Sequence, residues 1–203
     1  MVVDFVSQES SKPLDTYRAL VAATKPRPVL EIGTMQSVPG QSTHRMAWFP
    51  HIDRNDYVMA DIGQGDDVDV VCDIHNLPDD WQERFQSFLA LSVFQHLERP
   101  WIAAREINRI LKPGGYAYIE THQTFPLHGF PNDFFRFSTE ALSLLFRDAG
   151  FDIISAGYMD RCQVTPPPNV LPESWRDQWN SNHPSFIRVH ILVQKSYAEG
   201  PRP

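Results

Sequence analysis

The chain has 203 residues, of which 42% are hydrophobic and 21% are charged, and its formal net charge is −7. This is the length and composition of one ordinary globular domain, large enough to bury a core without disulfide or metal staples. The negative charge argues against broad adhesion to nucleic acids or to acidic membranes.

The first predicted elements are an arm, a helix and a strand. Residues 1–12 are expected to form a loose N-terminal arm. Asp15 is placed to cap a helix that continues to about Thr24, where the prolines that follow must end it. The next apolar run, Val29–Ile32, predicts a strand that leads into a turn at Gly33.

Six further strands and two further helices are expected. Short apolar or alternating runs predict strands at residues 57–60, 68–72, 88–91, 116–119, 151–156 and 189–193. After Pro100, apolar residues recur at helical spacing and predict a helix that the Lys-Pro-Gly-Gly run at 112–115 ends. Another helix is expected to begin with Ser138 as its cap and to end at Gly150.

The alternation of strands and helices predicts the fold class. It is typical of an α/β protein with a doubly wound, mainly parallel, seven-stranded sheet and helices on both faces. We expect one domain that comprises residues 1–203. The segment 163–184, which is rich in proline, asparagine, serine and tryptophan, is predicted to be a lid or loop, with a homodimer contact as the alternative.

Cysteine content and apolar runs bear on the cellular location. Cys72 and Cys162 are too few for a disulfide framework, so a buried free thiol is expected at each. No apolar run approaches the length of a membrane helix, and the N-terminus lacks the basic-then-apolar pattern of a secretion signal. These features favour a cytoplasmic protein.

Ligands of doubly wound sheets bind at the carboxyl ends of the strands, so the residues just after each strand are the first candidates for a site. Gly33 allows a tight turn and a close backbone approach. Asp61 follows the second strand, where a carboxylate can accept both hydroxyls of a ribose. Asp73 and Ser92 follow the third and fourth strands.

These residues stand in motifs that resemble those of the class I S-adenosylmethionine-dependent methyltransferases. The run Val-Leu-Glu-Ile-Gly at 29–33 is similar to the family's first motif, Asp61 to its ribose-binding acid, and 73–78 to the stretch that holds the adenine. The Ser-Val-Phe-Gln-His-Leu run at 92–97 and the segment 105–115, which ends in Lys-Pro-Gly-Gly, resemble two further motifs. The resemblance extends over roughly residues 28–155.

The resemblance implies a Rossmann-like methyltransferase fold and S-adenosylmethionine as the cofactor. The residues it places at the cofactor are Glu31, Gly33, Thr34, Met35, Asp61, Ile62, Asp73, Ile74, His75, Ser92, Val93 and His96. Each motif alone also has a simple structural explanation as a turn or a cap, so the argument depends on their order and spacing.

The sequence departs from the family pattern in two places. The glycine-rich loop keeps only Gly33 in register and continues with Thr34, Met35 and Gln36. S-adenosylmethionine has no phosphate, so a full pyrophosphate cradle is not needed, whereas a nicotinamide enzyme would need one. Gln95 stands where the family often has glutamate, which removes a charge and keeps hydrogen bonding.

The segment after the fifth strand is the candidate acceptor loop, because in the family this loop borders the methyl acceptor. His122 and His128 are candidate general bases, with His96 as a third, since histidine exchanges protons near neutral pH. Asp133 is a candidate to orient a histidine, and Arg136 to hold an anionic acceptor. The alternative is that Asp133 and Arg136 pair to fix the loop and the histidines are structural.

The predicted function is methyl transfer from S-adenosylmethionine to a small-molecule, natural-product or glycan acceptor, at oxygen or nitrogen, in biosynthesis. One alternative is a binding or interaction module that has lost methyl transfer. Another is an enzyme that binds S-adenosylmethionine and catalyses a different reaction. No nucleic-acid or membrane partner is expected, and no metal, because no tight ligand spacing supports one.

Overall fold

The computed structural model describes residues 12–23, 28–129, 132–167, 169, 172, 176, 179 and 184–197. The predicted N-terminal arm, apart from residue 12, lies outside the described residues. Parts of the predicted lid or loop at 163–184 lie outside them as well.

The described residues form three α-helices and a seven-stranded sheet. The helices are α1 (Lys12–Ala23), α2 (Pro100–Ile110) and α3 (Thr139–Asp148). The strands are β1 (Val29–Ile32), β2 (Tyr57–Asp61), β3 (Val70–Val71), β4 (Phe85–Leu91), β5 (Leu111–His122), β6 (Phe151–Cys162) and β7 (Ser185–Lys195). Short 3-10 turns lie at η1 (Met46–Trp48), η2 (Arg54–Asp56), η3 (Asp79–Trp81) and η4 (Phe94–His96).

The strand order is β3-β2-β1-β4-β5-β7-β6. Strands β1 to β5 run parallel to one another, and β7 is antiparallel to both β5 and β6. The order reverses at β1, which lies between β2 and β4, so the ligand-binding crevice is expected beside this strand. The predicted mainly parallel, seven-stranded α/β sheet is confirmed.

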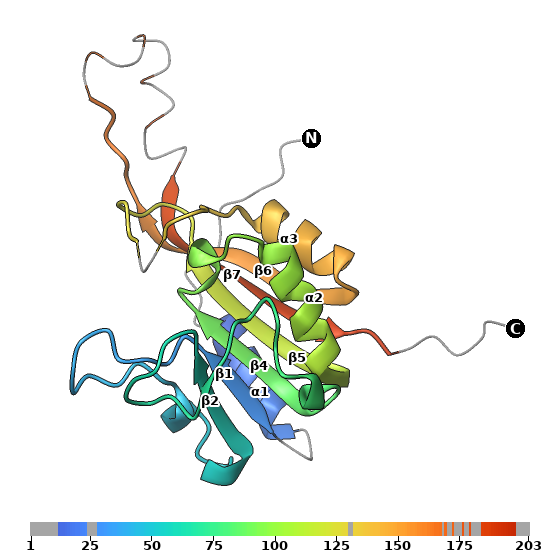
Figure 1. Ribbon diagram of the computed structural model, residues 1–203. Coiled ribbons are helices and arrows are strands. Elements are labelled where there is room, and N and C mark those ends of the chain that lie inside the picture. The colour runs from blue at the N-terminus through green and yellow to red at the C-terminus, as the bar shows by residue number, and fades with distance from the viewer. Residues whose placement is uncertain are drawn as a thin grey trace, which may run out of the picture.

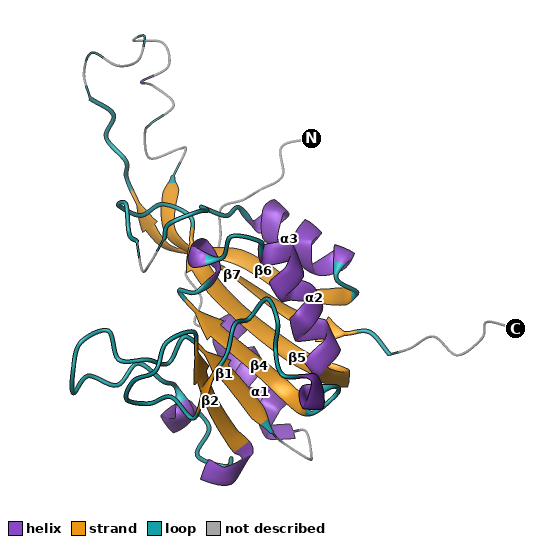
Figure 2. Ribbon diagram, viewed as in Figure 1, coloured by secondary structure: helices purple, strands orange, loops and turns teal. Residues whose placement is uncertain are grey.

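Helices cover both faces of the sheet, and Figures 1 and 2 show α2 and α3 together on one face with α1 on the other. Alternate residues of each strand point to opposite faces. Thus Leu30 of β1 and Ile119 of β5 pack in the core under α2 and α3, while Val29 and Tyr118 pack under α1. The near-continuous apolar strands follow from this double burial.

Local signals at the helix ends agree with the sequence except at α1. Ser138 caps α3, its hydroxyl accepting the Ala141 N–H at 3.1 Å, and Gly150 follows the helix with φ of +88°. Pro100 lies in the first turn of α2. The prediction that Asp15 caps α1 was wrong, because the helix begins at Lys12 and places Asp15 inside its first turn.

Both cysteines are free and half-buried rather than fully enclosed, and burial raises the pKa of Cys72 to about 11. Among the described residues, none of the helices has the length and apolar character needed to cross a bilayer.

Candidate active site

The turn after β1 is built on Gly33. Its φ of +90° belongs to the left-handed region, and its N–H donates to the Ala60 carbonyl at 2.9 Å. A Cβ added here would stand 2.4 Å from Cγ2 of Val93 in the turn after β4. The turns after β1 and β4 therefore touch at the switch point, and only glycine fits between them.

Asp61 ends β2 directly beside this turn. Its side chain is nearly buried, with 9% of the residue exposed, and its two oxygens accept the N–H groups of Met35 at 3.0 Å and of Gly63 at 3.2 Å. The Met35 side chain lies against Gly65, where an added Cβ would be 2.8 Å from its Cγ. Ile62, next to Asp61, is exposed.

Thr34 explains how the altered loop holds its shape without the further glycines of the family pattern. The residue is completely buried, and its hydroxyl bonds to the carbonyl oxygens of Asp67 at 2.7 Å and of Ala60 at 3.3 Å. The hydroxyl of Thr43 in turn donates to the Thr34 carbonyl at 3.0 Å. The loops after β1 and β2 are thus tied to each other.

Glu31 is fixed inside the protein rather than at its surface. One carboxylate oxygen accepts the Tyr57 hydroxyl at 2.6 Å and the Arg45 N–H at 2.8 Å. Burial raises the pKa of Glu31, although these hydrogen bonds favour its charged form. Through these contacts Glu31 of β1 connects Arg45, in the loop after β1, with Tyr57 of β2. No motif in the sequence indicates that Tyr57 and Arg45 are its partners.

The stretch after β3 makes a local turn. Asp73 accepts both the His75 N–H at 2.9 Å and the His75 Nδ1 at 2.7 Å, and these bonds outweigh desolvation to lower the pKa of Asp73. Nε2 of His75 accepts the Arg99 N–H at 3.3 Å. Ile74 is buried in the core, and the Asp73 carboxylate is half-exposed at this edge of the sheet.

The turn after β4 joins the two sides of the site. Ser92 is exposed with φ of +55°, and its N–H donates to the Glu120 carbonyl at 2.8 Å. The buried amide of Gln95 donates to the Ser92 carbonyl at 2.7 Å and accepts the Thr121 hydroxyl at 2.7 Å. An amide donates one bond and accepts the other here, whereas an ionised carboxylate could only accept, so glutamine suits the position where the family pattern often has glutamate.

The residues beside β1 fit S-adenosylmethionine in two respects. The Gly33 turn carries no side chain, so its backbone is bare at the switch point, and Asp61 keeps a carboxylate at the end of β2 with lone pairs beyond those used by Met35 and Gly63. Glu31 and Ile74 lie beneath this surface. Of the predicted cofactor residues, Gly33, Thr34, Met35, Asp61 and Val93 are therefore brought together by the fold.

The loop after β5 gathers aromatic rings. His122 stacks on Phe125, with ring centroids 4.1 Å apart and an interplanar angle of 13°. His128 lies 5.6 Å from His122 and 5.2 Å from His96 between ring centroids. His96 bonds through Nδ1 to the Asn132 carbonyl at 2.6 Å, so the structure places it with the acceptor loop.

His122 is the deepest member of this cluster. Only 5% of the residue is exposed, and its Nδ1 is buried without a hydrogen-bond partner. Burial, and to a lesser extent the electrostatic influence of His128, Arg136 and His96, lowers the pKa of His122 to about 4. The imidazole is therefore neutral at physiological pH.

Asp133 and Arg136 form an ion pair through both carboxylate oxygens, one contact being 2.7 Å. Arg136 also donates to the carbonyl oxygens of Phe125 at 3.2 Å and Pro126 at 3.0 Å, and Asp133 accepts the His128 N–H at 2.8 Å. The pair therefore ties together both ends of the loop. The hydrogen bond from Arg136 holds the pKa of Asp133 far below its usual range.

A second ionic cluster was missed by the sequence analysis. Arg188 of β7 bonds to the buried carboxylate of Glu120 on β5 and to Asp160 on β6. Burial raises the pKa of Glu120, and Arg188 opposes this shift. The only signal in the sequence was a charged residue within the apolar run of β7.

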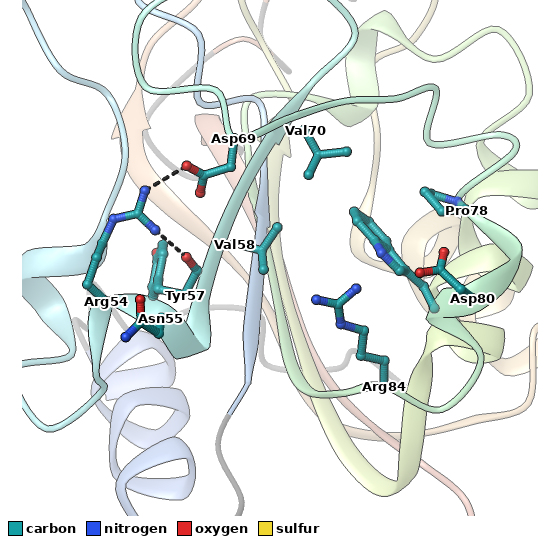
Figure 3. A pocket seen from close by; sticks show the side chains of 10 residues that line it. Arg54, Asn55, Tyr57, Val58, Asp69, Val70, Pro78, Asp80 and Arg84 are labelled. Carbon is teal, nitrogen blue, oxygen red and sulfur yellow. Dashed lines mark hydrogen bonds and ion pairs between the residues drawn. The ribbon is translucent and has the colours of Figure 1, made fainter.

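A hollow of about 700 Å3 lies at the opposite, amino-terminal end of β2 and β3 (Figure 3). Arg54 there bonds to Asp69 and to the Tyr57 carbonyl, both at 2.7 Å, and Arg84 lies over the Trp81 ring at 5.6 Å. The hollow is away from the strand ends that carry the predicted residues. Among the described residues, no cluster of three or more His, Cys, Asp or Glu side chains is placed to bind a metal.

Comparison with known proteins gives the same class as the motifs. A family model described as a methyltransferase domain matches residues 50–119. No curated protein sequence matches the chain. The class I methyltransferase resemblance is confirmed, and with it the expected enzyme class, whose cofactor is S-adenosylmethionine.

Solved structures share the architecture. YcgJ from Bacillus subtilis has a TM-score of 0.59 at 17% identity, over 92% of this chain and 100% of that one. The 1,6-didemethyltoxoflavin-N1-methyltransferase of Burkholderia thailandensis was solved with bound 1,6-didemethyltoxoflavin and S-adenosylhomocysteine. Its TM-score is 0.56 at 16% sequence identity, and the match covers 89% of this chain and 77% of that one. The [4+2]-cyclase SpnF has a TM-score of 0.53 at 18% sequence identity, and the match covers 94% of this chain and 85% of that one. Such identities establish the fold alone.

Proposed function

We propose that this chain transfers a methyl group from S-adenosylmethionine to an oxygen or nitrogen of a small-molecule acceptor. The observation that carries the proposal is the meeting of the Gly33 turn, Asp61 and Val93 at the switch point, beside a loop of histidines. The methyltransferase domain match and the small-molecule methyltransferase among the structural neighbours support it.

The residues have separate tasks in this proposal. Asp61 would accept the ribose hydroxyls, and the Gly33 turn would let the backbone lie against the cofactor. The bound cofactor supplies an electrophilic methyl group on a sulfonium. Because such a displacement depends strongly on alignment, the loop tied by Asp133 and Arg136 would hold the acceptor in place. His128 or His122 would take the acceptor proton.

Non-methylating chemistry is the second candidate, because the fold is shared with a [4+2]-cyclase. A binding module without chemistry is the third, motivated by the altered loop from Thr34 onward. A glycan acceptor, a homodimer, a cytoplasmic location and a single domain over 1–203 remain predictions from the sequence.

Calorimetric titration with S-adenosylmethionine and S-adenosylhomocysteine tests the cofactor site. Asp61→Asn should weaken binding of both by roughly tenfold, since an anionic hydrogen-bond acceptor for the ribose is lost. Asp66→Asn, an exposed acid on the same turn, is the matched control and should leave affinity unchanged.

The outcomes separate the three candidates. Binding of both compounds, followed by formation of S-adenosylhomocysteine with an acceptor, supports methyl transfer. Binding without such turnover across an acceptor panel favours a different reaction. Absence of binding to either compound would overturn the proposed function and favour the binding module. Unchanged affinity in Asp61→Asn would show that the ribose lies elsewhere.

A further inference from the structure

Glu120 of β5 lies on the same face of the sheet as the proposed cofactor residues. Residues two apart on a strand point to the same face, so Glu120 shares the face of Tyr118, which packs under α1. By the same rule Asp61 shares this face with Met59 of β2. A buried acid near the carboxyl end of β5 therefore stands on the side of the sheet where Asp61 would meet a cofactor.

The strand register places Glu120 level with the Gly33 turn. Ile32, the last residue of β1, pairs with Ala90 of β4. The following residue of β4, Leu91, pairs with Glu120 of β5. Two strand spacings therefore separate Gly33 from Glu120, about 10 Å across the sheet, with the half-buried Leu91 between them. An acceptor beside a cofactor at Gly33 on this face would extend over Leu91 to Glu120.

Two polar atoms without partners lie near Glu120 on this face. Oη of Tyr118 and Nδ1 of His190 are buried and make no hydrogen bond within the part of the chain that the structure describes. His190 pairs with Glu120 across β5 and β7, and its ring stacks on that of Tyr118, with centroids 6.0 Å apart. Such groups are costly to bury, and a native protein retains them mainly where a ligand, a water or a function uses them. The surroundings of Glu120 are therefore suited to a polar ligand.

Carboxylates outnumber guanidinium groups around Glu120. Arg188 is shared between Glu120 and Asp160. Arg45, whose N–H donates to Glu31, acts on the carboxylates of both Glu31 and Glu120. Burial raises the pKa of Glu120, and the two arginines oppose this rise without cancelling it. Three acids thus share two arginines, which leaves one negative charge over.

The other titratable groups near this face do not remove that charge. Burial lowers the pKa of both His122 and His190 to about 4, so both imidazoles are neutral at physiological pH. The ion pair of Asp133 and Arg136 in the acceptor loop adds no net charge. An anion bound against Glu120 would increase the negative charge, whereas a cation would offset it.

We propose that the methyl acceptor carries an amino group, and that Glu120 binds this group as a hydrogen-bonded ammonium. Glu120 then recognises the acceptor through a charge-assisted hydrogen bond on the α1 face of β5. This inference rests on the proposed function and names its substrate class. The proton of the methylated atom is still taken by a histidine of the acceptor loop.

Calorimetry at pH 7.5 with saturating S-adenosylhomocysteine tests the proposal with three probes on similar carbon skeletons. 2-Phenylethylamine is a cation at this pH, 2-phenylethanol is neutral and 3-phenylpropionate is an anion. We expect the amine to bind about tenfold more tightly than the alcohol and the carboxylate to bind most weakly. A preference for the amine below about threefold, or no binding of the amine, would overturn the proposal.

A matched pair of variants tests the role of Glu120 itself. Glu120→Gln keeps the shape and removes the charge, so it should weaken 2-phenylethylamine binding by about tenfold and change 2-phenylethanol binding by less than about twofold. Asp160→Asn removes the other carboxylate bound to Arg188, an exposed one that solvent screens, and should change neither probe by more than about twofold. A merely structural Glu120 would affect both probes alike, and that result contradicts the proposal.

Titration with S-adenosylhomocysteine alone separates this proposal from the proposed function. Failure of that compound to bind overturns the proposed function, while the probe series, repeated without it, still decides whether Glu120 binds an amine. Thermal unfolding checks that both variants are folded. If Glu120→Gln is unfolded, the ranking of the three probes on the native chain decides by itself.

Discussion

Buried polar side chains on the β1–β4 half of the sheet have hydrogen-bond partners, whereas several on the β5–β7 half do not. Glu31, Thr34, Asp61 and Gln95 all bond to neighbouring loops. Among the described residues, the buried side-chain polar atoms without a partner are Oη of Tyr118, Nδ1 of His122, Oγ of Ser155 and Nδ1 of His190. These four residues lie on β5, β6 and β7.

The difference separates two ways of preparing a binding site. On the side of the proposed cofactor site, the loops are held by bonds to each other, and such order would lower the entropy lost when a ligand binds. On the side of the predicted acceptor loop, Nδ1 of His122 is buried without a hydrogen-bond partner among the described residues. Three predictions test this contrast.

The largest effect is expected at the Gly33 turn. Gly33→Ala must adopt a left-handed φ and force a Cβ to within 2.4 Å of Val93, so it should lower the free energy of unfolding by about 3 kcal/mol. Gly40→Ala has the same sign of φ but open space, and should cost about 1 kcal/mol. Equal losses in urea unfolding would show that the turns after β1 and β4 are not closely packed.

An intermediate effect is expected at Gln95, which joins the two sides. Gln95→Glu removes the donor to the Ser92 carbonyl and places an acid in the core, so it should destabilise the fold by about 2 kcal/mol. The exposed control Gln82→Glu should stay within about 0.5 kcal/mol. Chemical denaturation measures both, and a neutral Gln95→Glu would mean that the family's glutamate fits equally well.

The smallest effect is a pH dependence on the acceptor side. Burial lowers the pKa of His190 to about 4, so between pH 6.5 and 4 the unfolded chain binds more protons than the folded one. The contribution of His190 to the free energy of unfolding should therefore be fully present above about pH 6.5 and should fall as the solution is acidified. His190→Phe should reduce the loss between pH 7 and 5.5 by about 1 kcal/mol.

The neighbour that stacks on His190 provides the control. Tyr118→Phe removes an unpartnered hydroxyl and keeps the ring, whose centroid lies 6.0 Å from that of His190. Because no group that titrates between pH 4 and 7 is removed, the pH dependence should match that of the native chain. An unchanged pH dependence in His190→Phe would contradict the assignment of a buried neutral imidazole.

Motifs at strand ends were the part of the site that the sequence could reveal. Gly33, Asp61 and Asp73 follow apolar runs, so the sequence predicts each of them at the carboxyl edge of the sheet, where the structure has them. The roles of these residues at a cofactor stay predictions. Of the two alternatives for Asp133 and Arg136, the structure shows the ion pair between them that fixes the loop. Residues three positions apart on one loop meet readily.

Local periodicity determined the seven strands, the α3 cap at Ser138 and the α/β class, since these depend on neighbours in the chain. Only the tertiary structure decided that Val93 closes on Gly33, that Met35 donates to Asp61 and that Arg188 reaches Glu120. Each of these contacts joins residues from different elements. The packing of the whole sheet brings these residues together, and no periodicity or motif in the sequence indicates which distant residues will be in contact.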